Sequence, residues 1–176
     1  GFQKIDKAVK QSIAIVKEAK LGKRDVLPTL WPRLNRNLLG GLQRGKMYVI
    51  AGRPGVGKSA FSNQLIFDVL DNNKDKNIVV LYWTFEMPGY QQVMRSASKD
   101  VKKEMADLLS INKRLSDMDF QSYAKKVMKY GNYPIYFNNV PRTMEYIMNA
   151  NEEIQLSKPT TTIINIFLSL IFYYLS

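Results

Sequence analysis

The chain has 176 residues, of which 45% are hydrophobic and 23% charged, a balance typical of one globular domain with a sizeable core. It contains no cysteine and no histidine, which excludes disulfides, the usual zinc sites and any Cys or His nucleophile–base pair within the chain. The formal net charge is +11, and residues 1–60 hold 13 lysines and arginines against three acidic residues. Polyanionic partners are one interpretation of this basic block, and well-solvated lysine-rich helices are the other.

The N-terminal segment predicts a helix followed by a linker. Apolar residues recur at steps of three and four over residues 4–20, which predicts an amphipathic helix with a lysine-rich opposite face. Gly22 is placed as the C′ residue that ends it, and Pro28 and Pro32 predict an extended or turned segment beyond. The helix must bury its apolar stripe on its own domain or on a neighbouring subunit. The first residues, GFQKIDKAVKQ, have no apolar signal core, so we do not expect secretion.

The motif GRPGVGKS at residues 52–59 matches the pattern G-x-x-x-x-G-K-[ST]. The preceding stretch, residues 47–51, is short and apolar and predicts a buried strand. The following stretch, residues 60–70, has apolar residues at helical spacing. Strand, glycine loop and helix are the context that a phosphate-binding loop requires, so we favour it over an ordinary glycine turn.

Strands and helices alternate in the rest of the chain. Residues 40–45 predict a turn, residues 78–85 a buried strand, residues 133–139 another strand, and residues 90–109, 116–130 and 143–155 helices. This alternation predicts βαβ units and a parallel sheet, hence an α/β fold. The last segment, residues 160–175, has an apolar run of about ten residues, too short for a membrane span of about 20. We expect a core strand there that runs on into an apolar tail.

A phosphate loop binds anions mainly through its backbone. The N–H groups of about residues 53–59 form an anion nest, and the positive end of the next helix adds to it. The candidate nucleotide-binding residues are Gly52, Arg53, Pro54, Gly55, Val56, Gly57, Lys58, Ser59 and Ala60. Lys58 is placed to reach the β- and γ-phosphates, and the Ser59 hydroxyl to ligate Mg²⁺. Glu86, at the C-terminal end of the second strand, is either a solvent-facing residue or the group that orients the attacking water.

The stretch from Leu39 to Ser98, and more loosely residues 5–155, resembles the C-terminal motor domain of the DnaB-type replicative DNA helicases. The resemblance is carried by LLGGLQRGKMYVIAGRPGVGKSAF, by LYWTFEMPGYQQVMRSAS and by YPIYFNNVP. It implies a RecA-like P-loop NTPase fold with a parallel sheet, ATP and Mg²⁺ as cofactors, and ATP-driven translocation on single-stranded DNA. By the same resemblance Lys58 and Glu86 are catalytic, and Ser59 is the metal ligand.

The resemblance also implies an organisation and a set of partners. Residues 1–27 correspond to the linker helix and linker, and residues 28–176 to part of the ATPase domain. The family assembles as a hexameric ring in which the helix at residues 4–20 packs on a neighbouring protomer. Primase or a helicase loader is a further candidate partner, no membrane is involved, and the expected location is the cytoplasm of a bacterial or phage-infected cell.

One family residue is missing. The next strand should end in an aspartate that supports Mg²⁺, in a context like I-I-x-D-x-L-x-L-I, but residues 163–171 read IINIFLSLI and no aspartate follows Asp119. Asn165 offers only a neutral oxygen. We therefore expect a truncated or frame-shifted motor domain, incomplete at its C-terminus, that does not unwind DNA alone. Its uncovered sheet edge is expected to favour self-association.

Two other functions stay open. Another RecA-like ATPase, of the recombinase or clock type, shares the GGLQRG and FEMP stretches loosely. A non-enzymatic protein that binds a helicase through residues 4–20, with a relic phosphate loop, is supported by the missing aspartate. A small-molecule kinase is disfavoured because no Arg-rich lid segment follows the loop.

Overall fold

The computed structural model describes residues 3–84, 87–140 and 142–168, without the side chain of residue 168. The chain forms two compact units, residues 1–49 and residues 50–176. The predicted division at residue 27 stays a prediction.

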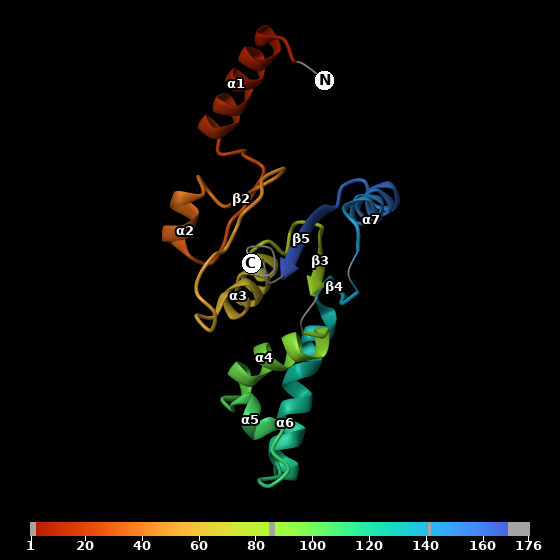
Figure 1. Ribbon diagram of the computed structural model, residues 1–176. Helices are drawn as coiled ribbons and strands as arrows, with labels where there is room; N and C mark the ends of the chain where they lie inside the picture. The colour runs from red at the N-terminus through yellow and green to blue at the C-terminus, as the bar shows by residue number, and fades with distance from the viewer. Residues whose placement is uncertain (1–2, 85–86, 141, 169–176) are drawn as a thin grey trace. The chain divides into compact units, whose positions relative to one another are not determined.

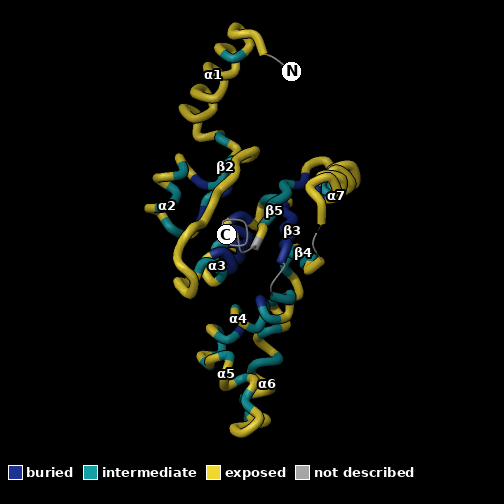
Figure 2. Tube along the Cα trace, viewed as in Figure 1, coloured by how far each residue is buried: buried dark blue, intermediate teal, exposed yellow. Residues whose placement is uncertain are grey.

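The first unit begins with the predicted amphipathic helix, α1 (Ile5–Lys20), none of whose residues is buried (Figures 1 and 2). The helix ends as its sequence predicts, because Gly22 takes a left-handed φ of 65°. Its N–H donates to the carbonyl of Ala19, and the N–H of Lys23 donates to that of Glu18. This pair of bonds is a Schellman motif. The apolar stripe, in contrast, is exposed, with Ile5 74% and Ile13 63% accessible.

The rest of the first unit holds two short strands and a helix: β1 (Val26–Leu27), α2 (Pro32–Asn37) and β2 (Leu42–Gln43). The strands pair antiparallel, with Val26 opposite Gln43. The extended or turned segment expected around Pro32 is only partly correct, because Pro32 opens a helix, where its missing N–H costs nothing. A Cβ at Gly41 would lie 2.3 Å from the carbonyl oxygen of Leu27, so only glycine fits this turn.

The prediction of a buried strand at residues 47–51 is wrong. These residues have no regular structure and are exposed, with Met47 86% and Val49 72% accessible. The physical reason is the lack of a partner: an apolar run becomes a strand only where a ladder pairs with its backbone. Among the described residues the three-stranded sheet has the order β4-β3-β5 and includes no strand from this segment.

The second unit carries the remaining helices and strands. In chain order they are α3 (Lys58–Asn72), β3 (Ile78–Thr84), α4 (Gly89–Val101), α5 (Met105–Leu108), α6 (Asp117–Val127), the 3₁₀ helix η1 (Met128–Asn132), β4 (Ile135–Asn138), α7 (Met144–Ser157) and β5 (Thr162–Leu168). The predicted helix at residues 90–109 is broken at Lys102, which takes a left-handed φ of 55°. The predicted start at Ser116 is confirmed, since its hydroxyl accepts the N–H of Asp119.

The sheet is parallel, as predicted. Strand β3 lies in the middle, with Val80 opposite Ile135 of β4 and opposite Ile164 of β5. All seven β3 residues are buried (Figure 2), which explains the continuous apolar run that predicted this strand. The final strand is also confirmed as β5, but residues 162–167 are half-buried or exposed instead of lying in the core. The apolar tail at residues 169–176 lies outside the described residues. Within the described part of the chain, no helix has the length and apolar character that crossing a bilayer requires.

Helices cover both faces of this sheet (Figure 1). On one face Val79, Leu81 and Trp83 pack with Ile147 of α7. Because side chains alternate along a strand, the residues between them point to the opposite face, which carries α3. In β3 and β5, odd-numbered residues therefore have side chains on the α7 side, and even-numbered residues have side chains on the α3 side.

Candidate nucleotide-binding site

The glycines of residues 52–59 shape the loop that the motif predicts. Gly55 and Gly57 take left-handed φ values of 79° and 91°, a region in which an L side chain is strained. At Gly52 a Cβ would lie 2.9 Å from a methyl group of Val56. Each of these three positions therefore favours glycine for a conformational or steric reason. The loop that they form is exposed to solvent.

Lys58 crosses this loop. Its ammonium group donates to the carbonyl oxygens of Gly52, at 2.9 Å, and Arg53, at 3.1 Å. Both bonds go to exposed backbone, so an incoming anion can replace them at small cost. The cation is thus held across the loop on two of its carbonyl oxygens, where its charge favours an anionic ligand.

Helix α3 begins at Lys58 directly after the loop, with Gly57 as its N-cap and no side-chain hydrogen bond at the cap. The first N–H groups of a helix have no intrahelical partner, and here they face the loop together with the positive end of the helix. The helix is anchored by its buried apolar side, where Val69 is fully buried and Ile66 is 3% exposed. Ser59 lies in the first turn, as a metal-ligating hydroxyl requires.

The loop lies at the end of the sheet where ligands gather in parallel α/β folds. Residues 73–77 join the C-terminal end of α3 to the N-terminal end of β3, so the two elements run in opposite directions. A helix of 15 residues and a strand of seven have similar lengths, roughly 22 Å each. The loop at the start of α3 is therefore beside the C-terminal end of β3.

The predicted catalytic residue Glu86 lies outside the described residues. The positions on either side of it are described. The buried hydroxyl of Thr84 donates to the carbonyl oxygen of Met87 and accepts the Met87 N–H at 3.2 Å. Thr84 was not among the predicted site residues; its only signal in the sequence was a polar residue at the end of a buried strand.

Asn165 does not lie on the side of the phosphate loop. It is opposite Leu81 in the sheet, and it accepts the indole N–H of Trp83 at 3.0 Å and donates to Asn151 of α7 at 3.1 Å. Both bonds place its amide on the α7 face. The residue of β5 that points to the α3 face near the strand end is Ile166, opposite Tyr82. The described residues of β5 thus include no acidic side chain on that face, and no cluster of three acidic ligands occurs in the described part of the chain.

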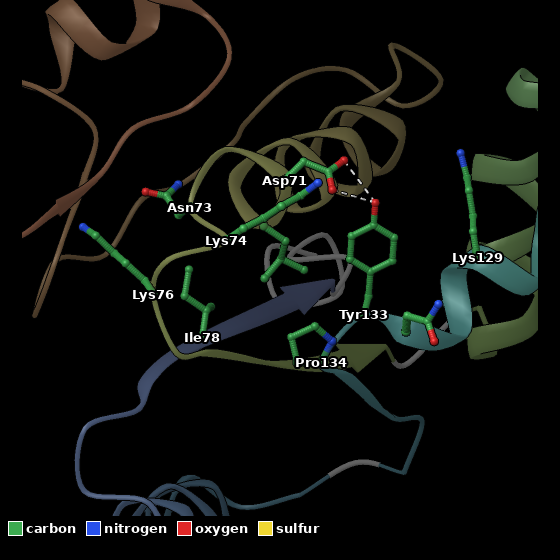
Figure 3. A pocket seen from close by; sticks show the side chains of 10 residues that line it. Asp71, Asn73, Lys74, Lys76, Ile78, Lys129, Tyr133 and Pro134 are labelled. Carbon is green, nitrogen blue, oxygen red and sulfur yellow. Dashed lines mark hydrogen bonds between the residues drawn. The ribbon is translucent and has the colours of Figure 1, made fainter.

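A pocket of about 380 Å³ lies at the opposite end of α3 (Figure 3). Its lining includes Asp71 and Tyr133, whose hydroxyl donates to both carboxylate oxygens of Asp71 at 2.9 and 3.0 Å. Partial burial and this hydrogen bond raise the pKa of Tyr133 to about 12. The lining also includes Lys74, Lys76 and Lys129, so acidic and basic groups both surround this pocket. The phosphate loop stays the candidate because it carries the glycine–lysine motif.

A parallel α/β unit with a glycine loop, a lysine across it and a helix directly after it defines a phosphate-binding nucleotide domain. The sequence profile of the DnaB-like helicase C terminal domain matches residues 27–172. The chain therefore belongs to this family, whose members generally use a nucleotide with Mg²⁺.

Individual relatives agree with this assignment. The chain is 26% identical over 146 residues to the replicative DNA helicase DnaC of Bacillus subtilis, covering 80% of this chain and 30% of the relative. It is 27% identical over 128 residues to the replicative DNA helicase DnaB of Helicobacter pylori, covering 71% of this chain and 25% of the relative. The chain thus spans less than a third of these curated relatives.

Solved structures support the fold. The ATPase domain of G40P superposes with a TM-score of 0.72 at 19% identity, over 94% of this chain and 56% of that one. A DnaB-like replicative helicase, solved in a study of its interactions with primase, also gives 0.72, at 18% identity, over 94% and 38%. The second unit therefore has the RecA-like α/β fold that the sequence predicted.

Proposed function

We propose that this chain is part of an ATP-driven DNA helicase motor and that residues 52–60 bind the phosphates of ATP. The observation that carries the proposal is the Lys58 ammonium group bonded across the loop to Gly52 and Arg53, directly before the N-terminus of α3. In this assignment Lys58 moves to the β- and γ-phosphates, and the loop N–H groups bind the remaining oxygens. Glu86 orients the attacking water.

The residues fit the phosphates better than they fit the metal. The Ser59 hydroxyl is placed to hold Mg²⁺, which would neutralise charge on the phosphates. The second support that hydrolysis needs, an acidic group near the metal, has no candidate on the α3 face of β5, where Ile166 stands. We therefore expect nucleotide binding that is stronger than turnover.

Nucleotide binding and turnover by the purified chain test this proposal. Replacing Lys58 with alanine removes a charge-assisted hydrogen bond worth about 1.5–3 kcal/mol, so ATP affinity should fall about tenfold to a hundredfold. Lys74→Ala is the matched control, an exposed lysine just beyond the other end of α3. Equal affinity in the wild type and Lys58→Ala would refute the assignment of the loop.

The proposed partners are single-stranded DNA and further copies of this chain, in a hexameric ring. The exposed apolar stripe of α1 supports self-association, because Ile5, Val9 and Ile13 are each at least half accessible. Changing these three residues to serine should leave the stability of the second unit unchanged and shift the chain to smaller species in analytical ultracentrifugation. If the distribution of sedimenting species does not change, α1 does not mediate the self-association.

The missing acid favours a second candidate, a non-enzymatic partner of a helicase ring. The same triple-serine variant separates the two functions when a full-length DnaB-type helicase is added. An interaction protein binds that helicase through α1 and has no ATP turnover, whereas a motor fragment binds single-stranded DNA with an affinity that falls steeply with salt.

A further inference from the structure

One buried amide joins the helix of the phosphate loop to the next helix. Asn63 of α3 is 4% exposed. Its Nδ2 group donates to the backbone carbonyl of Gln92, at 3.0 Å, and to the hydroxyl of Ser96, at 2.9 Å. Both acceptors belong to α4, one turn apart, so both amide hydrogens of Asn63 are used on that helix.

These bonds matter because few residues of α4 are buried. Gln92 and Ala97 are its only buried residues, and the side-chain amide of Gln92 has no hydrogen-bond partner among the described residues. The other polar link between the helices, from Lys99 to Gln64 at 2.6 Å, is exposed. Exposed pairs contribute little to stability. Asn63 therefore supplies the main buried polar attachment between α3 and α4.

Asn63 also stands close to the proposed nucleotide site. It lies four residues after Ser59, so the two side chains share one face of α3. The start of α4 lies close against the sheet, since a Cβ at Gly89 would lie 2.7 Å from the ring of Phe137 in β4. A ligand that orders the first turn of α3 thus acts on a helix that is bonded directly to α4.

We propose that Asn63 is a positioning residue that couples α4 to the phosphate loop, so that a nucleotide bound at residues 52–59 also orders α4. This inference rests on the proposed nucleotide binding. Its physical basis is that binding lowers the local opening of the segments bonded to the site. Without the two Asn63 bonds, α4 opens independently of the loop.

Hydrogen exchange of the full chain, with and without Mg²⁺–ADP, tests this coupling. In the wild type, nucleotide should slow exchange both in peptides covering residues 52–60 and in those covering residues 89–101. Asn63→Asp keeps the shape but sets a carboxylate against the Gln92 carbonyl, and Asn63→Leu keeps the bulk without either bond. In both variants, Mg²⁺–ADP should still slow hydrogen exchange in the loop. The amides of α4 should exchange about tenfold faster than in the wild type, and the nucleotide should no longer slow them.

Asn73→Ala is the matched control. Asn73 is a 3% exposed residue at the C-cap of α3, and its Nδ2 donates to the Val69 carbonyl at 2.8 Å. Its loss removes a buried amide bond far from α4, so the α4 response should persist. The coupling would be overturned if nucleotide slowed exchange in α4 of Asn63→Leu as much as in the wild type. It would also be overturned if nucleotide slowed exchange in the wild-type loop but not in the wild-type α4. A wild-type loop that does not respond would count against the nucleotide site itself, and against any coupling that depends on it.

Discussion

The two neighbouring residues Asn165 and Ile166 allow a sharp test of the sheet geometry. Asn165 offers the substitution with the least change of shape, because asparagine and aspartate are nearly isosteric, whereas the pattern I-I-x-D-x-L-x-L-I aligns its aspartate with Ile166. In the structure, Asn165 points to the α7 face and Ile166 to the α3 face. Asn165→Asp should therefore fail to restore Mg²⁺-dependent nucleotide binding, and Ile166→Asp should restore it.

The cost of Asn165→Asp can be estimated from its two hydrogen bonds. The bond from the Trp83 indole survives, because an oxygen still accepts it. The bond to Asn151 is lost, although rotation of the Asn151 amide can return a donor. The net loss is about 1 kcal/mol, which lowers the melting temperature by about 3 °C for a domain of this size.

The gain expected of Ile166→Asp is larger. A carboxylate that supports Mg²⁺ through a charge-assisted bond contributes about 1.5–3 kcal/mol, hence about tenfold to a hundredfold in affinity for the Mg²⁺ nucleotide. Titrations with ATP, with and without Mg²⁺, measure this effect, and thermal melts check the folding of each variant. Greater Mg²⁺-dependent affinity in Asn165→Asp than in Ile166→Asp would refute the face assignment.

Three further substitutions test the fold. Gly89→Ala should lower the free energy of unfolding by about 1–3 kcal/mol, because its Cβ would lie 2.7 Å from the ring of Phe137. Gly41→Ala should destabilise the first unit by about 1–3 kcal/mol, because its Cβ would meet the carbonyl of Leu27 and its φ is 146°. Tyr133→Phe should flatten the loss of stability between pH 10 and pH 12, because the folded pKa of this tyrosine is raised from 10.0 to about 12.

Urea unfolding curves measure all three effects, and Gly131→Ala is a control for the glycines, with no atom within 4 Å of its added Cβ. The sign of the pH effect follows from the raised pKa. The neutral phenol is favoured in the folded state, so its contribution is complete below pH 10 and is lost as the pH rises through 12. Equal slopes in the wild type and Tyr133→Phe over this range would contradict the hydrogen bond to Asp71.

The elements that the sequence predicted well are those whose signals are local. The left-handed Gly22 ends α1, and Ser116 caps α6, because a cap depends on a few adjacent residues. Strand β3 was predicted from the continuous β-prone run at residues 78–85. The break at Lys102 gave no such signal, since neither glycine nor proline marks it. The role of Asn63 was equally hidden, because its partners in α4 lie 29 and 33 residues away in the sequence.

The phosphate loop and residues 47–51 before it show the same contrast between local and long-range determinants of structure. The features that shape the loop are local, namely the torsions of its glycines and the Lys58 bonds across it. Residues 47–51 have an equally clear apolar signal, yet they remain exposed, because a strand needs a partner to bond its backbone. A binding motif can thus be complete in its local geometry while the sheet that supports it is not. The nucleotide-binding half of the proposed activity therefore depends on local residues, and the hydrolytic half depends on the sheet.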